Sequence, residues 1–420
     1  MAAVKPFDFE RLPKKPTFLL TLAKYLISFP DLQKRGFTYE KINMEGLKPP
    51  YLLLSNHGSM VDFNIMLKLT DPYPVNNVMT LEGFHDYTEI LMRNLGVLGK
   101  RKFIKDLYLL KNIRYCLEKL HTVFVLYPEA RYSLDGTTSF LPDSLAKMCK
   151  MMKVPVVVLN QHGNFVSCPQ WNKKNKKAPV HAVMTQIVNQ EEIKMISVSE
   201  IDERIRKAFV YDDFRYQKEK GLAIADKERA NGLHSILYQC PHCNTEFQMD
   251  SKGTRLWCES CKKEWEMSEL GELSALEGET EFSHIPDWFA WERSNVRREI
   301  EQGTYYFEDA VRIDTLPNAK GFIHQPDGIL RQDMTGTTIE GTAYGKPFCL
   351  HKTPLDLESM HIEYDYKKKG DCVDISVANE SYWCYPKNRR DVISKLSIAT
   401  EELYLYEKRK KKEERAKKSN

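Results

Sequence analysis

The chain has 420 residues, of which 42% are hydrophobic and 11% aromatic, so it can bury the cores of two or three domains and is not composed like a disordered protein. Its formal net charge is +4, but residues 408–418 hold eight basic and two acidic residues, a net of +6, which leaves −2 for the rest. A basic surface over the whole protein, as in a general nucleic-acid binder, is therefore not indicated.

The N-terminal segment does not have the pattern of a secretory signal, because residues 1–16 are polar and include Asp8, Glu10 and three prolines. Residues 17–29 are apolar but contain Lys24, and they are too short to span a bilayer, which takes about 20 apolar residues. We interpret 17–29 either as an interfacial helix at a membrane surface or as a helix packed on the first domain. The ten cysteines, without a signal, favour a metal site in a reducing, cytoplasmic compartment.

Residues 1–235 alternate strand-like and helical patterns. Helical windows at 60–69 and 105–120 separate short continuous apolar runs, which are typical of strands covered on both faces. The runs are YLLLS (51–55), TVFVLYP (122–128), VPVVVLN (154–160) and HAVMTQIV (181–188). Strands that alternate with helices predict an α/β sandwich with a mostly parallel central sheet.

The stretch 52–63, LLLSNHGSMVDF, contains a candidate catalytic pair. Ser59 followed by Asp62 is typical of the start of a helix, and by itself it makes His57 an ordinary loop histidine. The same start places His57 in the turn before the helix, where the Asp62 carboxylate can reach back to the imidazole. A carboxylate that holds one imidazole nitrogen makes the other a base near neutral pH.

A covalent nucleophile is less well supported by the sequence. Ser55 and Ser59 lie beside the histidine, but the sequence contains no G-x-S-x-G motif. Direct attack by an acceptor hydroxyl on a thioester therefore fits better than an acyl-enzyme.

Further candidate groups follow along the chain, each with an ordinary structural alternative. Residues 95–103 have two glycines and then three cations, which suits a phosphate or is simply a basic turn. After the strand at 122–126, Glu129 can accept a hydrogen bond from a hydroxyl and Arg131 can pair with a phosphate. Residues 154–160 are a buried strand whose end can line an acyl pocket.

These segments, in their order, resemble the four motifs of the glycerophospholipid acyltransferases, the 1-acylglycerol-3-phosphate acyltransferase family. The resemblance covers roughly residues 40–210 and rests on Asn56-His57-x4-Asp62, Gly96 to Lys102, Tyr127-Pro128-Glu129 and Val154-Pro155-Val156. It implies that His57 is the general base and Asp62 its partner, with acyl-CoA or acyl-carrier protein as donor and a lysophospholipid as acceptor. For substrate binding it implies Asn56, Ser59, Arg101, Lys102, Glu129, Arg131 and Ser133.

The third motif departs from the family pattern. The family usually has Phe-Pro-Glu-Gly-Thr-Arg-Ser, whereas this chain has Ala130, Arg131 and Tyr132 after the glutamate, which moves the basic residue by one position. Acyl transfer to a lipid hydroxyl is therefore a firmer expectation than a particular phosphate-bearing acceptor.

Residues 236–272 contain the most specific local pattern, four cysteines in two close pairs. The spacing Cys240-x2-Cys243-x14-Cys258-x2-Cys261 is typical of a structural zinc ribbon, with a redox pair or an iron–sulfur cluster as alternatives. The acidic residues of this segment argue against binding to a nucleic-acid backbone.

The last part, 285–407, begins with a helical pattern and continues with many short strand-like segments. A closing helix is predicted by apolar residues spaced four and three apart, namely Val392, Leu396, Ala399, Leu403 and Tyr406. This arrangement looks like a small β-rich domain of the pleckstrin-homology or GRAM type. The basic tail at 408–420 is either a solvated helix end or an electrostatic contact with anionic lipid or RNA.

Three functions are compatible with these patterns. We expect an O-acyltransferase of lipid metabolism that is peripheral on the cytoplasmic face of a membrane. The altered third motif leaves open a lipid-binding scaffold without activity. The ribbon and the tail leave open a nucleic-acid-associated protein, although nucleic acid is the less expected partner.

Overall fold

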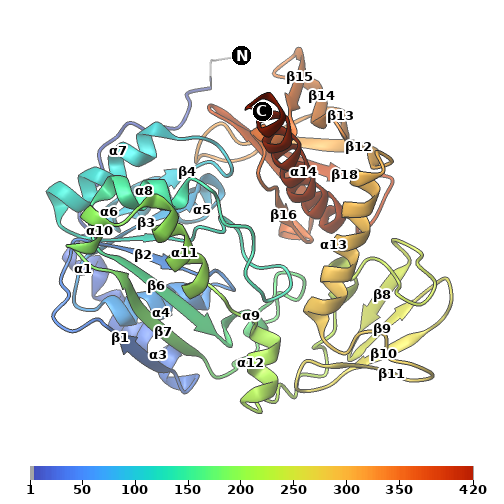
Figure 1. Cartoon of the computed structure of the whole chain (residues 1–420), viewed down its shortest axis with the longest axis horizontal. Helices are drawn as coiled ribbons and strands as arrows, with labels where there is room; N and C mark the ends of the chain where they lie inside the picture. The colour runs from blue at the N-terminus through green and yellow to red at the C-terminus, as the bar shows by residue number, and fades with distance from the viewer. Residues whose placement is uncertain (1–3, 420) are drawn as a thin grey trace. The chain divides into compact units, whose positions relative to one another are not determined.

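The computed structural model describes residues 4–419; residues 1–3 and 420, the last residue of the tail, lie outside the described part. The chain divides into two units, one mainly Phe7–Arg101 and Lys105–Ile224, the other mainly Ala225 to the C-terminal end (Figure 1). None of the described helices combines the length and the apolar character needed to cross a bilayer.

The first unit is built on a seven-stranded sheet with the order β1-β7-β6-β2-β5-β3-β4. Neighbouring strands are parallel except for β6 and β7, which are antiparallel, so the predicted mostly parallel sheet is confirmed. In sheet order the strands are β1 (Thr38–Ile42), β7 (His181–Val188), β6 (Val156–His162), β2 (Tyr51–Ser55), β5 (Val123–Leu126), β3 (Val75–Thr80) and β4 (Val97–Lys100).

Helices cover both faces of this sheet, which explains the continuous apolar runs. Leu52 and Leu54 of β2 belong to one core, and Tyr51 and Leu53 belong to the core on the opposite face. Successive strand residues point to opposite faces of the sheet, so the residues on both faces of β2 must be apolar. The first core includes α7 (Leu107–Tyr115), α8 (Leu145–Met152) and α11 (Val198–Ala208), and the second includes α3 (Ser28–Lys34) and α4 (Val61–Thr70).

The sequence predicted one helix over the apolar segment 17–29, and this prediction is wrong. The segment forms a series of short helices instead. The series is α1 (Phe18–Thr21), α2 (Ala23–Leu26) and the start of α3. Pro30 accounts for the break after Leu26, because a proline ring clashes with the carbonyl four residues earlier in a continuous helix. Among the side chains described in this segment, the exposed large hydrophobic ones are Phe18, Leu19, Leu22, Tyr25, Leu26 and Ile27.

The remaining helices of the first unit are short. They are α5 (Leu81–Tyr87), α6 (Glu89–Asn94), a π-helical turn at Cys116–Leu120 that continues α7, α9 (Asn164–Ser167), α10 (Glu192–Met195) and α12 (Asp213–Glu219).

The second unit contains two antiparallel sheets and two long helices. The smaller sheet has the order β11-β10-β9-β8, with β8 (Met249–Lys252), β9 (Arg255–Cys258), β10 (Glu264–Met267) and β11 (Leu273–Ala275). The larger has the order β15-β14-β13-β12-β18-β17-β16, with β12 (Tyr306–Thr315), β13 (Ile323–Asp333), β14 (Gly336–Ala343), β15 (Lys346–Lys352), β16 (His361–Glu363), β17 (Cys372–Val377) and β18 (Glu380–Pro386). The helices are α13 (Ile285–Glu301) and α14 (Ile393–Ser419), and α14 carries the basic tail as helix up to Ser419.

Candidate active site and metal centre

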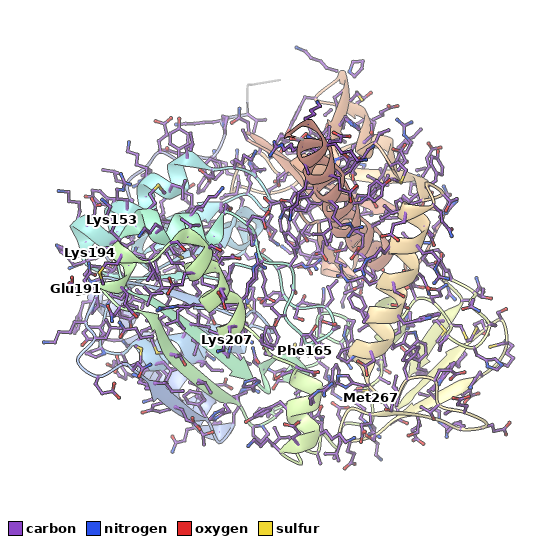
Figure 2. The ribbon with its side chains drawn as sticks, viewed as in Figure 1. Lys153, Phe165, Glu191, Lys194, Lys207 and Met267 are labelled. Atoms are coloured by element: carbon purple, nitrogen blue, oxygen red, sulfur yellow. The ribbon has the colours of Figure 1, made fainter. Side chains whose placement is uncertain are left out.

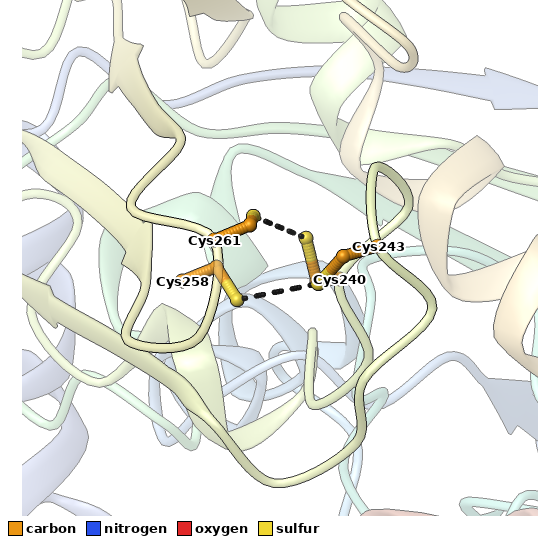
Figure 3. A group of neighbouring side chains, drawn as sticks. All are labelled: Cys240, Cys243, Cys258 and Cys261. Atoms are coloured by element: carbon orange, nitrogen blue, oxygen red, sulfur yellow. Dashed lines mark hydrogen bonds between the residues drawn. The ribbon is translucent and has the colours of Figure 1, made fainter.

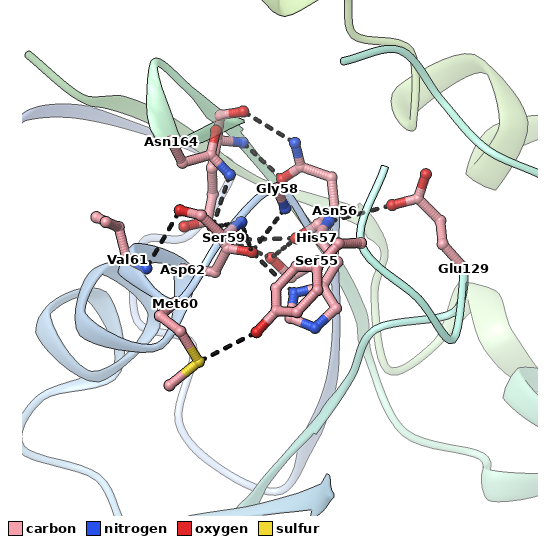
Figure 4. A network of polar contacts seen from close by, with 12 residues as sticks. Ser55, Asn56, His57, Gly58, Ser59, Met60, Val61, Asp62, Glu129 and Asn164 are labelled. Carbon is pink, nitrogen blue, oxygen red and sulfur yellow. Dashed lines mark hydrogen bonds and ion pairs between the residues drawn. The ribbon is translucent and has the colours of Figure 1, made fainter. Parts of the chain in front are cut away.

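The predicted pair lies where β2 ends. His57 is in the turn between β2 and α4, and Asp62 is in the first turn of α4. The imidazole Nδ1 lies 2.8 Å from Asp62 Oδ2 (Figure 4). The carboxylate is buried, whereas 22% of the His57 side chain is exposed. A bond to Nδ1 leaves Nε2 as the nitrogen available to a substrate proton.

The Asp62 carboxylate is held by several donors besides the imidazole. The N–H of Gly58 donates to Oδ2 at 2.7 Å, and the N–H of Ser59 contacts both oxygens at 3.1–3.2 Å. The amide of Asn164 donates to Oδ1 at 2.7 Å. One of the two hydrogen bonds of the expected capping box is therefore present: the Asp62 side chain accepts from the Ser59 N–H. The Ser59 hydroxyl instead accepts from the Val61 N–H at 3.3 Å.

Glu129, after β5, anchors the backbone of the histidine. Its Oε2 accepts from the His57 N–H at 3.1 Å, and its Oε1 accepts from the Ser139 N–H at 2.6 Å and the Tyr211 hydroxyl at 2.8 Å. Only 2% of Glu129 is exposed. Both carboxylate oxygens thus have partners within the protein. The expected contact of Glu129 with an acceptor hydroxyl stays a prediction.

Burial is also the main influence on the pKa of Glu129, which it raises from 4.5 to about 7 against the hydrogen bonds and the charge of Arg131. A carboxyl whose pKa is higher in the folded than in the unfolded state stabilises the fold when protonated. This contribution is complete below about pH 4.5 and is lost as the pH rises through about 7.

Three other expected substrate contacts are bonded inside the protein. The Asn56 side chain donates to the Gln161 carbonyl at 2.9 Å and accepts from the Gln161 N–H at 2.8 Å, which ties the end of β2 to β6. The Ser133 hydroxyl donates to the Thr137 carbonyl at 2.8 Å. Asn56, Ser59 and Ser133 are all buried, so they shape the turn around His57.

The basic candidates are distributed differently. Arg131 is 5% exposed and lies close enough to Glu129 to lower its pKa. Arg101 is buried after β4, three strand positions from β2, which corresponds to about 14 Å at the usual strand spacing. Lys102 groups with the second unit. The structure thus brings Glu129 to the backbone of His57, with Arg131 near Glu129, but leaves Arg101 at the edge of the sheet.

Two tyrosines enclose the imidazole of His57. The ring of Tyr127 stacks on it with centroids 4.2 Å apart, and that of Tyr132 approaches to 3.9 Å at a tilt of 32°. The Tyr132 hydroxyl donates to Met60 Sδ at 3.1 Å (Figure 4), and Met60 is 61% exposed. The surface next to the imidazole is therefore aromatic and apolar, with Tyr132 where the acyltransferase motif that the sequence resembles has an arginine.

Ala130 adopts a backbone conformation that favours glycine, with a φ of 55°. This left-handed conformation costs an alanine about 1–2 kcal/mol, which glycine does not pay. Glycine also has more freedom in the unfolded state, and this reduces the gain in stability by about 0.5–1 kcal/mol. We expect Ala130→Gly to raise the free energy of unfolding by about 0.5–1 kcal/mol, measured by urea denaturation. The control is Ala146→Gly inside α8, which should lower it; a loss of stability in both variants would contradict the strain at Ala130.

Asn164 and Tyr211 belong to the site, although the sequence did not point to either. Asn164 follows β6, so His57, Glu129 and Asn164 come after three adjacent parallel strands, β5, β2 and β6. The only available signal for Asn164 was its position at the end of an apolar strand, which is where α/β folds place functional groups. Tyr211 follows α11 and had no such signal.

The four cysteines form one cluster in the second unit. Their Sγ atoms lie within 4.8 Å of one another, with Cys240 and Cys261 3.7 Å apart and Cys243 and Cys258 3.8 Å apart (Figure 3). Four thiolates at about 2.3 Å from a tetrahedral zinc ion would lie about 3.8 Å apart, so the geometry fits zinc. The two cysteine loops match: Asn244 and Lys262, each four residues after the first cysteine of its pair, have φ values of 61° and 62°.

Comparisons with known proteins add one distant likeness. No family model matches the chain, and no curated protein matches it. Among solved structures, the 1-acyl-sn-glycerophosphate (LPA) acyltransferase PlsC from Thermotoga maritima is similar over 45% of this chain and 78% of that one, with 15% sequence identity and a TM-score of 0.34.

Proposed function

We propose that this protein is an O-acyltransferase that moves a fatty acyl group from a thioester, acyl-CoA or acyl-carrier protein, to the hydroxyl of a lysophospholipid-like acceptor. The contact between His57 Nδ1 and Asp62 Oδ2, at 2.8 Å, is the observation that supports it most directly. Because Asp62 is buried and bonded by four further N–H contacts from three residues, the carboxylate is fixed where it can orient the imidazole.

In this mechanism, His57 Nε2 takes the proton of the acceptor hydroxyl while its oxygen attacks the thioester carbonyl carbon. The carbonyl becomes a tetrahedral oxyanion, and its collapse breaks the carbon–sulfur bond. The departing thiolate takes the proton from the imidazolium and leaves as a thiol. An ester bond replaces a thioester bond, and His57 is neutral again.

Direct attack by the acceptor is supported by the state of the nearby serines. Ser55 is fully buried, donates to the Asn56 carbonyl and accepts from the Gln161 amide. Ser59 and Ser133 are also buried and bonded within the turn. A serine nucleophile must meet the thioester, and these three hydroxyls face the interior.

A lipid substrate agrees with the apolar surface of the first unit. The exposed side chains of α1 and α2 are the kind that enter a membrane interface, and Lys24 within them lies 2.5 Å from Asp71. We therefore extend the proposal to a peripheral protein on the cytoplasmic face of a membrane. We also propose that the cysteine cluster holds a structural zinc ion. The seven-stranded sheet of the second unit, β12 to β18, is proposed to form with α14 a domain of the pleckstrin-homology or GRAM type.

The test is a product screen with His57→Ala. Purified wild type is incubated with acyl-CoA or acyl-carrier protein and a panel of lysophospholipids in vesicles, and new acylated lipids are identified by mass spectrometry. We expect a product whose rate falls by about 10²- to 10⁴-fold in His57→Ala and is unchanged in His121→Ala, an exposed loop histidine of the same unit. Vesicle binding without product from the folded wild type would favour the scaffold instead.

A further inference from the structure

We propose that Asn164 is a positioning residue for the His57–Asp62 pair: its amide fixes the Asp62 carboxylate, and the carboxylate in turn fixes the orientation and tautomer of the imidazole. The role in turnover rests on the proposed acyl transfer, but the contacts that define it do not.

The first support is the division of donors between the two oxygens of Asp62. Oδ2 receives His57 Nδ1 and the Gly58 N–H, whereas Oδ1 receives the Asn164 amide at 2.7 Å and the Ser59 N–H at 3.2 Å (Figure 4). Asn164 is therefore the only side chain other than His57 that bonds the carboxylate among the described contacts. Without it, Oδ1 keeps one long bond, and the carboxylate can rotate away from Nδ1.

The second support is the other end of the Asn164 side chain. Asn164 is 1% exposed, and its Oδ1 is buried without a hydrogen-bond partner among the described residues. A buried unpaired carbonyl costs about 1–3 kcal/mol. Rotating the amide by 180° would place this oxygen against the Asp62 carboxylate, which is worse still. The side chain thus keeps an unsatisfied atom while its donor is directed at Asp62.

The third support is the way in which the start of α9 is held. Asp213 of α12, itself 1% exposed, accepts from the N–H groups of Gly163, Phe165 and Val166 at 2.8–3.3 Å, on both sides of Asn164. Phe165, labelled in Figure 2 beside α12, packs edge-on against Phe214. A buried carboxylate and an aromatic contact therefore fix the backbone that carries the amide.

Gly58 completes the arrangement from the opposite side. A Cβ atom at this position would lie 2.6 Å from the Asn164 Nδ2 atom and 2.9 Å from the Phe165 backbone nitrogen. Such distances are below van der Waals contact, so only glycine lets the amide reach Asp62. The His57 turn and the start of α9 are thus fitted to each other around this one hydrogen bond.

The experiment compares Asn164→Asp and Asn164→Ala with wild type in two measurements. The first is kcat and KM for acyl transfer. The second is the imidazole tautomer of His57, from ¹⁵N chemical shifts assigned with His57→Ala. The matched control is Asn160→Ala, on the same β6, whose amide bonds the Ala208 carbonyl and not the dyad.

We expect kcat to fall by about 10- to 100-fold with little change in KM, and the Nδ1–H tautomer to become mixed with the Nε2–H form. Asn160→Ala should change neither. A tautomer and a kcat that stay as in wild type would overturn the proposal. If wild type makes no product, the acyltransferase function fails by itself; a tautomer change in Asn164→Ala would then still support the positioning role, and an unchanged tautomer would overturn it.

Discussion

Replacing Asp62 with asparagine is expected to lower the rate of acyl transfer by about 10³- to 10⁴-fold, the loss seen when a histidine base is left in the wrong tautomer. The carboxylate accepts from His57 Nδ1 and from N–H groups on Gly58, Ser59 and Asn164. An asparagine NH₂ in place of Oδ2 would face His57 Nδ1 and the Gly58 N–H, and in place of Oδ1 it would face the Asn164 amide and the Ser59 N–H. Either orientation sets donor against donor, and the imidazole no longer has a charged acceptor that fixes its tautomer. The measurement is kcat/KM with the acceptor identified by the product screen.

The control for this variant is Asp71→Asn. Asp71 follows the same helix, α4, and pairs with Lys24, so it tests the effect of losing a carboxylate in that region of the fold. It should keep the wild-type rate. Circular dichroism shows whether each variant is folded, and a folded Asp62→Asn variant with wild-type turnover would refute the general-base mechanism.

Removal of the proposed zinc ion is expected to destabilise the second unit by several kcal/mol, because the cysteine loops that would bind it are part of the packing of this unit. Trp265 of β10 is fully buried and meets Trp288 of α13 edge-on, with ring centroids 5.0 Å apart. The Trp288 indole donates to the Gln239 carbonyl, next to Cys240, at 2.9 Å. The folded cysteine loop thus supplies contacts to α13.

A partly buried ion-pair network extends the same connection to α14. Lys395 of α14 lies 2.8 Å from Glu246, just after Cys243, and 2.8 Å from Glu299 of α13. If the cysteine loop unfolds, Lys395 loses Glu246, one of its two acidic partners. The partly buried Lys395 charge is then less well compensated, which lowers the free energy of unfolding.

The zinc experiment has three parts. Bound metal is measured by mass spectrometry, expected at one zinc per chain, and unfolding is followed by tryptophan fluorescence with and without a chelator. Cys258→Ser should lower the unfolding midpoint in the same way as the chelator. Cys349→Ser, an exposed cysteine on β15 outside the cluster, should not. Unchanged unfolding of the metal-free protein would show that the loops fold without the ion.

Much of the first unit could be predicted because local patterns and packing agree. The run 51–55 is apolar at every core position because both faces of β2 are covered, and the structure confirms this with Leu52 and Leu53 in opposite cores. The place of His57 followed from the spacing of Ser59 and Asp62, since a helix start fixes the turn before it. The four-cysteine cluster followed from its spacing in the same way.

Other features depend on contacts between distant segments, and a single sequence does not encode these locally. Asn164 bonds Asp62 across 102 residues, and Tyr211 bonds Glu129 across 82. The Ser139 N–H and the Tyr211 hydroxyl also reach one oxygen of Glu129 from outside its motif, and the expected contact of Glu129 with the substrate stays a prediction. In contrast, the break in segment 17–29 was visible in principle, because Pro30 stands four residues after Leu26.

The order of strands β6, β2 and β5 also fixes the spacing of three site residues independently of the loops around them. His57, Glu129 and Asn164 each follow one of these strands, so their spacing is set by the hydrogen-bonding distance of the sheet, about 4.8 Å per strand. That spacing stays the same when the loops beyond them change in length or composition. Met60 is exposed and Tyr132 contacts the imidazole ring, and neither lies on a strand, so either can be replaced without altering that spacing. In the proposed acyltransferase, the surface that meets the acceptor would therefore be separable from the groups that move the proton.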